Sequence, residues 1–244
     1  MKAYTATDID QAITASLQAL QTDYIDLYQV HWSMNMKDVA ETVTELNRQR
    51  ALGRIRHYGV CNFGPSNIKD FLAAGGQPCS LQVPYSLLWR AIVFDVLPVS
   101  RQHDLSVLAY SPLQQGLLTG RFYKASEVPE GRRRTRHFSK DSTTLSRHKQ
   151  EGAESETFQA ISDIRDLCSK EDVPMTSSAL SWILAQEGVA SIIVGCRTPQ
   201  QLADNCKLVK LSQSIVKRLS EITDALKETL GDNPDMWAKS SRYK

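Results

Sequence analysis

The chain has 244 residues, which is long enough to bury a sizeable core as one domain or two. Hydrophobic residues make up 41% and charged residues 23%, the balance of an ordinary globular protein, and the formal net charge is +2. This charge gives no electrostatic reason to expect nucleic acid or a membrane surface as a partner, and no apolar run approaches the roughly 20 residues that a membrane span needs.

The cysteines and the N-terminus indicate the compartment. The five cysteines are an odd number without a CxxC spacing, which argues against a disulfide framework and against a structural zinc site, so we expect no metal. Residues 1–10 lack the apolar stretch of a secretory signal peptide, which argues against secretion. We therefore expect a cytoplasmic protein with reduced thiols.

The first elements alternate between helix and strand. A helix is predicted to begin at Thr7, with Asp10 three residues further on as a capping-box-like partner. A β-rich run over 24–30 follows and ends at His31, and a second helix is predicted over 38–52.

The alternation then continues along the chain. Apolar runs that predict strands are followed by polar residues, and helical patterns lie between them. The predicted strands are 55–60, 80–83, 105–108 and 190–194, and the predicted helices are 66–74, 94–103 and 212–230.

Strands that alternate with helices predict βαβ units and a parallel sheet, here with five strands. No GxGxxG or Walker A sequence occurs at a strand end, which argues against the doubly wound nucleotide-binding folds. The repeating unit favours a (β/α) barrel, formed by residues 1–244 as a single domain.

One polar segment interrupts this pattern. Residues 123–156 hold 8 Lys or Arg and 6 Asp or Glu, including four arginines within 131–136. We interpret about 123–157 as a long surface loop or lid. The arginine run is typical of a solvated face, and the alternative is contact with a cofactor phosphate or an acidic substrate.

Polar side chains follow the predicted strands at their carboxyl ends, where the chemistry of a barrel gathers. Any one of them has an ordinary structural interpretation, but their succession at five strand ends favours a site. They are His31, Cys61 and Asn62, Gln82, Tyr110 and Ser111, and residues 195–198.

The last of these strand ends has the most explicit physical signal. Thr198, Pro199 and Gln201 stand at the N-cap, first and third positions of a helix, as in a capping box. The N–H groups of such a terminus attract anions, and Arg197 beside it suits a bidentate phosphate contact. The alternative is an ordinary capped helix with an exposed arginine.

Three other strand-end side chains suit the recognition of a planar ligand. Tyr110 offers a flat face for stacking, and Asn62 and Gln82 carry the donors and acceptors that recognition of a carboxamide requires. His31 suits an acid or a polariser of a carbonyl group. The alternatives are a core tyrosine and a hydrogen-bonded core histidine.

Five stretches of the chain resemble the aldo-keto reductase family. They are SLQALQTDYIDLYQVHW (16–32), GRIRHYGVCNF (53–63), LQVPYSLLWR (81–90), LAYSPLQQGLLTGRF (108–122) and ALSWILAQEGVASIIVGCRTPQQLADN (179–205). The resemblance implies a TIM-type (β/α)8 barrel that binds NADP(H) and transfers hydride between the nicotinamide and a small-molecule aldehyde or ketone.

The resemblance also implies a role for individual residues. His31 matches the active-site histidine, and Cys61 replaces the serine that usually precedes Asn62. The residues implied to bind the cofactor are Cys61, Asn62 and Gln82 at the carboxamide, Tyr110 at the ring, Ser111, Pro112, Leu113, Gly116, Leu118 and Arg121 along the pyrophosphate, and Gly195, Arg197, Gln201 and Asn205 around the adenosine and its 2′-phosphate.

The resemblance begins within what would be the third helix of the family. Family members start with three βα units that carry a catalytic Asp, a proton-donating Tyr and a Lys. Of the usual Asp, Tyr, Lys and His set, only the histidine has a counterpart here, His31. We therefore expect a truncated, incomplete barrel of about five strands that is weak or inactive alone, with self-association or a partner covering its open edges. The alternative is an inert or regulatory nicotinamide-nucleotide-binding module. An unrelated aldolase-type barrel is disfavoured because no strand-end lysine suits a Schiff base.

Overall fold

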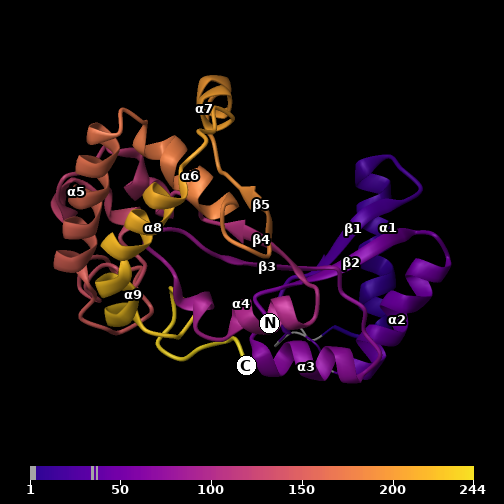
Figure 1. Ribbon diagram of the computed structural model, residues 1–244. Coiled ribbons are helices and arrows are strands. Elements are labelled where there is room, and N and C mark those ends of the chain that lie inside the picture. The colour runs from indigo at the N-terminus through magenta and orange to yellow at the C-terminus, as the bar shows by residue number, and fades with distance from the viewer. Residues whose placement is uncertain (1–3, 34–35, 37) are drawn as a thin grey trace. The chain divides into compact units, whose positions relative to one another are not determined.

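The computed structural model describes residues 4–33, 36 and 38–244. Within them, five strands form one sheet whose spatial order is the order of the sequence (Figure 1). The β1–β2 and β2–β3 pairs are parallel, with Val30 opposite Val60 and Cys61 opposite Gln82. The strands are β1 (Ile25–Val30), β2 (Ile55–Cys61), β3 (Ser80–Pro84), β4 (Ser106–Tyr110) and β5 (Val189–Ile193).

Helices connect these strands, as the alternation predicted. The α-helices are α1 (Ala6–Leu20), α2 (Val39–Ala51), α3 (Pro65–Ala73), α4 (Val96–Gln102), α5 (Glu154–Lys170), α6 (Met175–Leu184), α7 (Pro199–Asn205), α8 (Gln213–Ile222) and α9 (Asp224–Leu230). Short 3₁₀ helices are η2 (Ala91–Val93), η3 (Gln114–Thr119), η4 (Ala125–Glu127) and η5 (Glu130–Arg132). None of the helices in the described part of the chain is both long and apolar enough to cross a membrane.

The chain forms two compact units. Unit 1 comprises Met1–Val83, Pro98–Val107 and Arg242–Lys244, and unit 2 comprises Pro84–Leu97 and Leu108–Ser241. The chain passes from unit 1 to unit 2 within β3 and again within β4, and it returns to unit 1 within α4 and after Ser241. The three C-terminal residues therefore belong to the same unit as β1 and β2.

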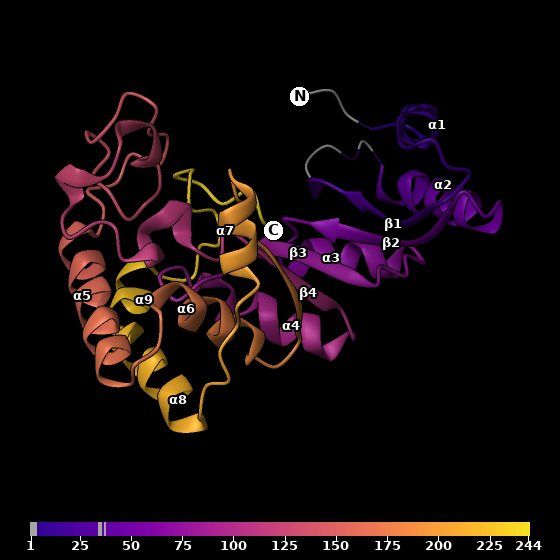
Figure 2. The ribbon, with the colours of Figure 1, turned by 90° about the horizontal axis from the view of Figure 1, so that it is seen from above.

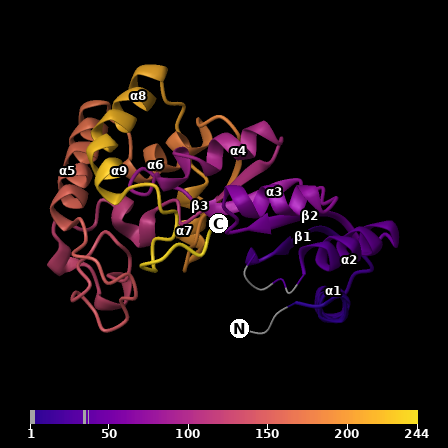
Figure 3. The ribbon, with the colours of Figure 1, turned by 90° about the horizontal axis from the view of Figure 1, so that it is seen from below.

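In unit 1, α1 and α2 lie side by side and α3 lies next to α2 (Figures 2 and 3). The side chains of Ile13, Leu46 and Ile55 are fully buried in the core of this unit. Helix α1 begins one residue before the predicted Thr7.

The N-cap of α1 is therefore Thr5, which forms a complete capping box with Asp8. Asp10, the predicted partner, instead accepts hydrogen bonds from Arg48 at 2.8 Å and Arg54 at 2.9 Å. The predicted position of the box was wrong because two threonine–aspartate pairs share the same spacing.

In unit 2, α5, α8 and α9 lie side by side (Figures 1 and 3). The single helix predicted over 212–230 is divided into α8 and α9 at Thr223. Arg90 lies at this break, where its Nη1 donates to Ser220 O at 2.7 Å, to Thr223 Oγ1 at 3.0 Å and to Asp224 Oδ1 at 2.9 Å. The Ser220 carbonyl also accepts from Thr223 N at 3.1 Å, so α8 ends in a tight turn at this point.

The polar segment before α5 differs from the surface loop predicted for it. Its central residues, from Thr135 to Phe138, are buried. The Arg136 guanidinium donates to Gln150 Oε1, Asn233 O and Leu230 O, and the His137 ring bonds to Leu88 O at 2.8 Å. Polar side chains are buried here because each has partners, which composition alone does not reveal.

Candidate functional site

In unit 1, the predicted site residues lie together at the carboxyl ends of adjacent strands. His31 follows β1, Cys61 ends β2, and Gln82 lies opposite Cys61 in β3. The backbone N–H of Asn62 extends the β2–β3 pairing by donating to Gln82 O at 2.9 Å. The parallel register thus gathers these side chains, as their positions in the sequence predicted.

The Asn62 side chain is held by several partners. It is only 2% exposed, and its backbone is left-handed, with φ of 59°. Its Nδ2 donates to His31 O and to Cys61 Sγ, each at 3.2 Å, and its Oδ1 accepts from the Tyr243 hydroxyl at 2.7 Å. The orientation of this amide is therefore fixed.

The C-terminal residues pack beside Asn62. Tyr243 is buried, and its ring meets Trp32 edge-on at a centroid distance of 5.7 Å. Lys244 N donates to Asn67 Oδ1 at 2.7 Å, and Asn67 N donates to Lys244 O at 2.9 Å. Sequence reasoning missed Tyr243, because no local pattern connects it to β2.

The surroundings of Cys61 and Gln82 restrict their chemistry. Burial raises the pKa of the Cys61 thiol to about 12, so it is a neutral group and no nucleophile at physiological pH. Gln82 Oε1 accepts from Gln29 Nε2 at 2.6 Å. Gln29 and His31 also line a cavity of about 350 Å³ in this unit.

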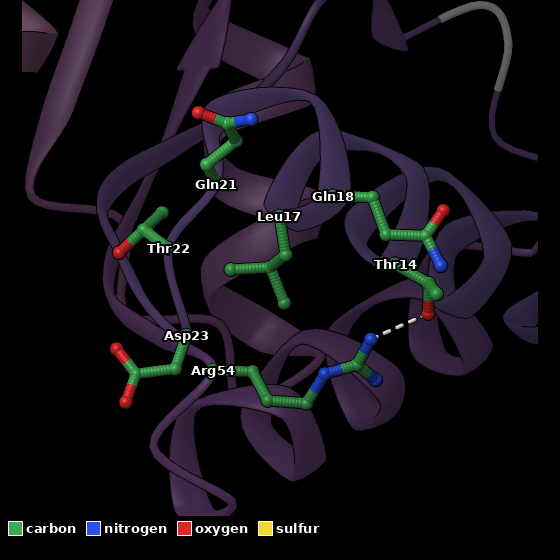
Figure 4. A pocket seen from close by; sticks show the side chains of 7 residues that line it. All are labelled: Thr14, Leu17, Gln18, Gln21, Thr22, Asp23 and Arg54. Atoms are coloured by element: carbon green, nitrogen blue, oxygen red, sulfur yellow. Dashed lines mark hydrogen bonds between the residues drawn. The ribbon is translucent and has the colours of Figure 1, made fainter.

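A further cavity of unit 1 lies away from these residues. It has a volume of about 600 Å³, and its lining includes Asp23 and Arg54, which precede β1 and β2 (Figure 4). The Arg54 guanidinium donates to Thr14, as the dashed line shows, and also to Asp10 and Gln49. These contacts at the amino ends of the strands are those of a structural arginine.

In unit 2, Tyr110 ends β4 and is half-buried. Its ring is stacked on that of Trp237, with centroids 6.2 Å apart and planes 10° from parallel. One face of the predicted aromatic platform is therefore in contact with an indole that sequence reasoning did not single out.

The chain turns sharply after Tyr110. Four residues there have left-handed backbone conformations: Ser111, Gln114, Gln115 and Gly116, with φ of 55°, 44°, 56° and 96°. At Gly116 a side chain would also crowd Arg132, because a Cβ would lie 3.2 Å from Arg132 Nη1. With φ of 96°, this position favours glycine, and a larger residue would also require the flexible Arg132 side chain to shift.

A cavity of about 1190 Å³ in unit 2 collects most of the remaining predicted residues. Leu118 does not line it, because its side chain is fully buried in the core. The predicted residues that line the cavity are Ser111, Pro112, Leu113, Gly116, Arg121, Gly195, Arg197, Gln201 and Asn205. The lining also contains Arg132, Arg134, Asp204 and Lys207, none of which was predicted as a site residue.

The end of β5 forms the predicted helix start with one difference. Thr198 Oγ1 accepts from Gln201 N at 3.2 Å, and Pro199 is the first residue of α7. The Gln201 side chain, however, accepts from Arg197 N at 2.8 Å, one residue before the N-cap. Gln201 thereby fixes the backbone beside the Arg197 guanidinium.

Comparison with known proteins identifies the family. Residues 1–224 match the model of the Aldo/keto reductase family. The chain belongs to this family. The resemblance seen in the sequence is thus confirmed.

Individual relatives agree with this assignment. The chain is 32% identical over 223 residues to the NADH-specific methylglyoxal reductase of Escherichia coli (strain K12), covering 89% of this chain and 65% of that protein. It is 27% identical over 224 residues to the aldo-keto reductase yakc [NADP(+)] of Schizosaccharomyces pombe (strain 972 / ATCC 24843), covering 88% and 62%.

A solved relative supports the fold. The structure of the glycerol dehydrogenase AKR11B4 from Gluconobacter oxydans is similar with a TM-score of 0.75 and 26% identity, over 89% of this chain and 64% of that one. The α/β class predicted from the alternation is therefore confirmed, with five strands in one sheet of the described residues, and the similar structures belong to the TIM-barrel-type family implied by the resemblance. The chain spans about 65% of the length of the relatives it matches.

Proposed function

We propose that this chain binds NADP(H) and belongs to an enzyme that transfers hydride between the nicotinamide and an aldehyde or ketone. The observation that carries the proposal is the cavity of about 1190 Å³, because the loop after β4 and the turn after β5 line it together. Its volume exceeds the usual range for small-molecule pockets, as an extended dinucleotide requires.

The charges of this cavity suit phosphate groups. Asp204 is the acidic residue of the lining, and it accepts a hydrogen bond from Lys207 at 2.8 Å. The cationic residues of the lining are Arg121, Arg132, Arg134, Arg197 and Lys207. Guanidinium groups bind phosphate oxygens bidentately, so the excess of arginine supports a phosphorylated ligand.

The residues implied by the resemblance have individual roles in the proposed chemistry. Asn62 and Gln82 would hold the carboxamide, and Tyr110 would support the ring. The bound cofactor supplies the hydride. His31 would donate a hydrogen bond to the carbonyl oxygen and so stabilise the negative charge that develops there.

We further propose that NADPH is preferred to NADH. The Escherichia coli relative is named as NADH-specific, whereas the name of the Schizosaccharomyces pombe relative includes NADP(+). The proposed preference of this chain therefore rests on Arg197. Its guanidinium is exposed and forms no ion pair with any residue in the described ranges. A free arginine beside a capped helix start provides a site for the 2′-phosphate.

Fluorescence titration with NADPH and NADH tests this preference. We expect NADPH to bind about tenfold more tightly, since a charge-assisted contact contributes about 1.5–3 kcal/mol. Arg197→Gln is expected to abolish most of the difference, and Lys210→Gln, at an exposed lysine outside the cavity lining, serves as the control. Equal affinities of the unmodified chain for the two dinucleotides would contradict the preference.

The alternative is a catalytically inert or regulatory nucleotide-binding module of the same fold. One observation favours it, namely that the Tyr243 hydroxyl already bonds to Asn62 Oδ1, where a carboxamide would be recognised. Oxidation of NADPH in the presence of an aldehyde, by a protein that contains this chain, would exclude the inert module.

A further inference from the structure

The C-terminal segment, residues 242–244, returns from unit 2 to unit 1 and lies outside the helices and strands. The Lys244 backbone exchanges two hydrogen bonds with Asn67 near the start of α3. The Arg242 guanidinium lies over the Trp32 ring, 4.2 Å from its centroid. The segment can therefore move away while β1, β2 and α3 keep their own backbone hydrogen bonds.

Tyr243 of this segment occupies the acceptor atom of the Asn62 amide. Its hydroxyl donates to Asn62 Oδ1 at 2.7 Å, whereas Asn62 Nδ2 donates to His31 O and Cys61 Sγ. The Oδ1 atom is the acceptor of an asparagine side chain, so it would receive the N–H of a carboxamide. Tyr243 is 6% exposed and Asn62 is 2% exposed. A ligand therefore reaches Oδ1 only after the tyrosine has moved.

The bond between Tyr243 and Asn62 has two opposite interpretations for ligand binding. A tyrosine that stays in place orients the amide for the ligand, and its removal weakens binding. A tyrosine that has to leave competes with the ligand, and its removal strengthens binding. The second interpretation is favoured here, because the hydroxyl and a carboxamide N–H are both donors to one buried atom.

We propose that the C-terminal segment is a displaceable autoinhibitory segment, in which the Tyr243 hydroxyl competes with the nicotinamide carboxamide for Asn62 Oδ1. This inference rests on the proposed function and adds a means of regulation to it. The chain has a closed form, with Tyr243 on Asn62, and an open form that accepts the carboxamide. The apparent Kd of the dinucleotide is raised by about the ratio of the closed form to the open form.

Isothermal titration calorimetry with two ligands tests the inference. The ligands are NADPH and adenosine 2′,5′-bisphosphate, which lacks the nicotinamide. Gly64→Ala displaces the segment without altering Tyr243 or Asn62, because a Cβ at this position would lie 2.5 Å from Lys244 O. Tyr123→Phe is the matched control, because Tyr123 is exposed and does not line the cavity of about 1190 Å³. The forms compared are the unmodified chain, the deletion of 242–244, Tyr243→Phe, Gly64→Ala and Tyr123→Phe.

We expect the deletion and Gly64→Ala to bind NADPH about tenfold more tightly than the unmodified chain. Tyr243→Phe keeps the ring contact with Trp32 and loses only the hydroxyl, so a gain of about threefold is expected. Adenosine 2′,5′-bisphosphate should bind equally to all forms, and Tyr123→Phe should bind both ligands like the unmodified chain. Far-UV circular dichroism verifies that each form is folded, and Tyr243→Phe decides the question if the deletion does not fold.

Each contrary result has a distinct meaning. If the unmodified chain binds NADPH and the variants bind it no more tightly, the inference is wrong and the proposed function stands. Weaker binding by Tyr243→Phe also overturns the inference, since the tyrosine would then orient the amide. Equal tightening for adenosine 2′,5′-bisphosphate overturns it as well, because that ligand has no carboxamide. If neither the unmodified chain nor the deletion binds NADPH, the proposed function and the inference both fail.

Discussion

At the scale of single residues, Asn62 determines how the carboxyl ends of β1 and β2 are held. Its backbone is left-handed, a conformation that asparagine tolerates better than most residues. Its amide joins His31 O, Cys61 Sγ and the Tyr243 hydroxyl. One buried side chain thus connects a strand end to a residue 181 positions away.

Asn62→Ala is expected to lower the free energy of unfolding by about 2–4 kcal/mol, measured by urea denaturation. The loss combines about 1 kcal/mol for a left-handed alanine with the cost of leaving the buried Tyr243 hydroxyl without its acceptor. Asn62→Gly separates the two causes, because it removes only the backbone strain and should recover about 1 kcal/mol. An alanine variant as stable as the unmodified chain would show that these bonds contribute nothing.

The sequence predicted some of these residues and not others. His31, Asn62 and Gln82 were predicted because each directly follows or ends an apolar run, and parallel strands bring such positions together. Tyr243 and Trp237 were not predicted, because each meets its partner only through long-range folding. Arg132 and Arg134 were left among solvated charges, since composition does not show which side chains turn toward a cavity.

At the scale of elements, the polar segment is folded around a buried histidine. Burial lowers the pKa of His137 to about 4, and Leu88 O accepts from its ring. The ring is therefore neutral in the folded protein at neutral pH. Burial also lowers the pKa of His148 in the same segment.

This environment makes stability depend on pH. Between pH 6.5 and about 4, the unfolded chain protonates His137 and the folded chain does not, so stability is retained above pH 6.5 and lost as the pH falls toward 4. We expect His137 to account for about 2 kcal/mol of the loss between pH 7 and pH 5. Urea denaturation of His137→Gln at both values should show a smaller loss.

His57→Gln is the control for this measurement, because His57 is exposed on β2 and should leave the pH dependence unchanged. Identical pH dependence in His137→Gln and in the unmodified chain would contradict the assignment.

The start of α3 is shaped by the end of the chain. A Cβ at Gly64 would lie 2.5 Å from Lys244 O, although the Gly64 backbone itself is extended and accessible to alanine. We therefore expect Gly64→Ala to displace the C-terminal residues, so that carboxypeptidase releases them at least threefold faster. Gly131→Ala is the control, because no atom lies within 4 Å of a Cβ at that position. Release at the unmodified rate in Gly64→Ala would show that this contact does not hold the C-terminus.

The strand positions could be predicted from the apolar runs, whereas α5 and α6 were not predicted and several other errors arise from contacts between distant segments. Strand β2 is one residue longer than the strand predicted over 55–60, because Cys61 also pairs with Gln82 of β3. The helix predicted over 212–230 is divided at Thr223, where the junction is held by Arg90, a residue whose distant position no helical pattern reveals. Likewise, the burial of residues 135–138 depends on partners in other segments.

At the scale of the whole molecule, the strand order leaves β1 and β5 at the two ends of the described sheet. The side chain of Ile193 in β5 is 44% exposed, so apolar surface lies along that edge. Exposed edge strands favour pairing with another chain. Coverage of these edges by a second copy or a partner remains our proposal for how this sheet is protected.

The residues that the proposed reaction needs also lead to an expectation for the activity of the polypeptide 1–244. We propose that it carries His31 of the reaction but not the Asp, Tyr and Lys that the resemblance implies. We expect this polypeptide, produced alone, to show no NADPH oxidation with a small aldehyde above the rate without protein. The Escherichia coli relative serves as the positive control, and robust turnover by 1–244 would contradict this expectation and the inert alternative together.

The stacking of Tyr110 on Trp237 has a practical consequence. Trp89 and Trp182 are fully buried and Trp32 and Trp237 are half-buried, and of these Trp237 is the one in contact with the ring proposed to support the nicotinamide. The ultraviolet emission of this indole therefore senses its immediate neighbourhood at Tyr110. Trp237 is a built-in optical reporter, with which the arrival of a ligand at that ring can be timed without attaching a dye.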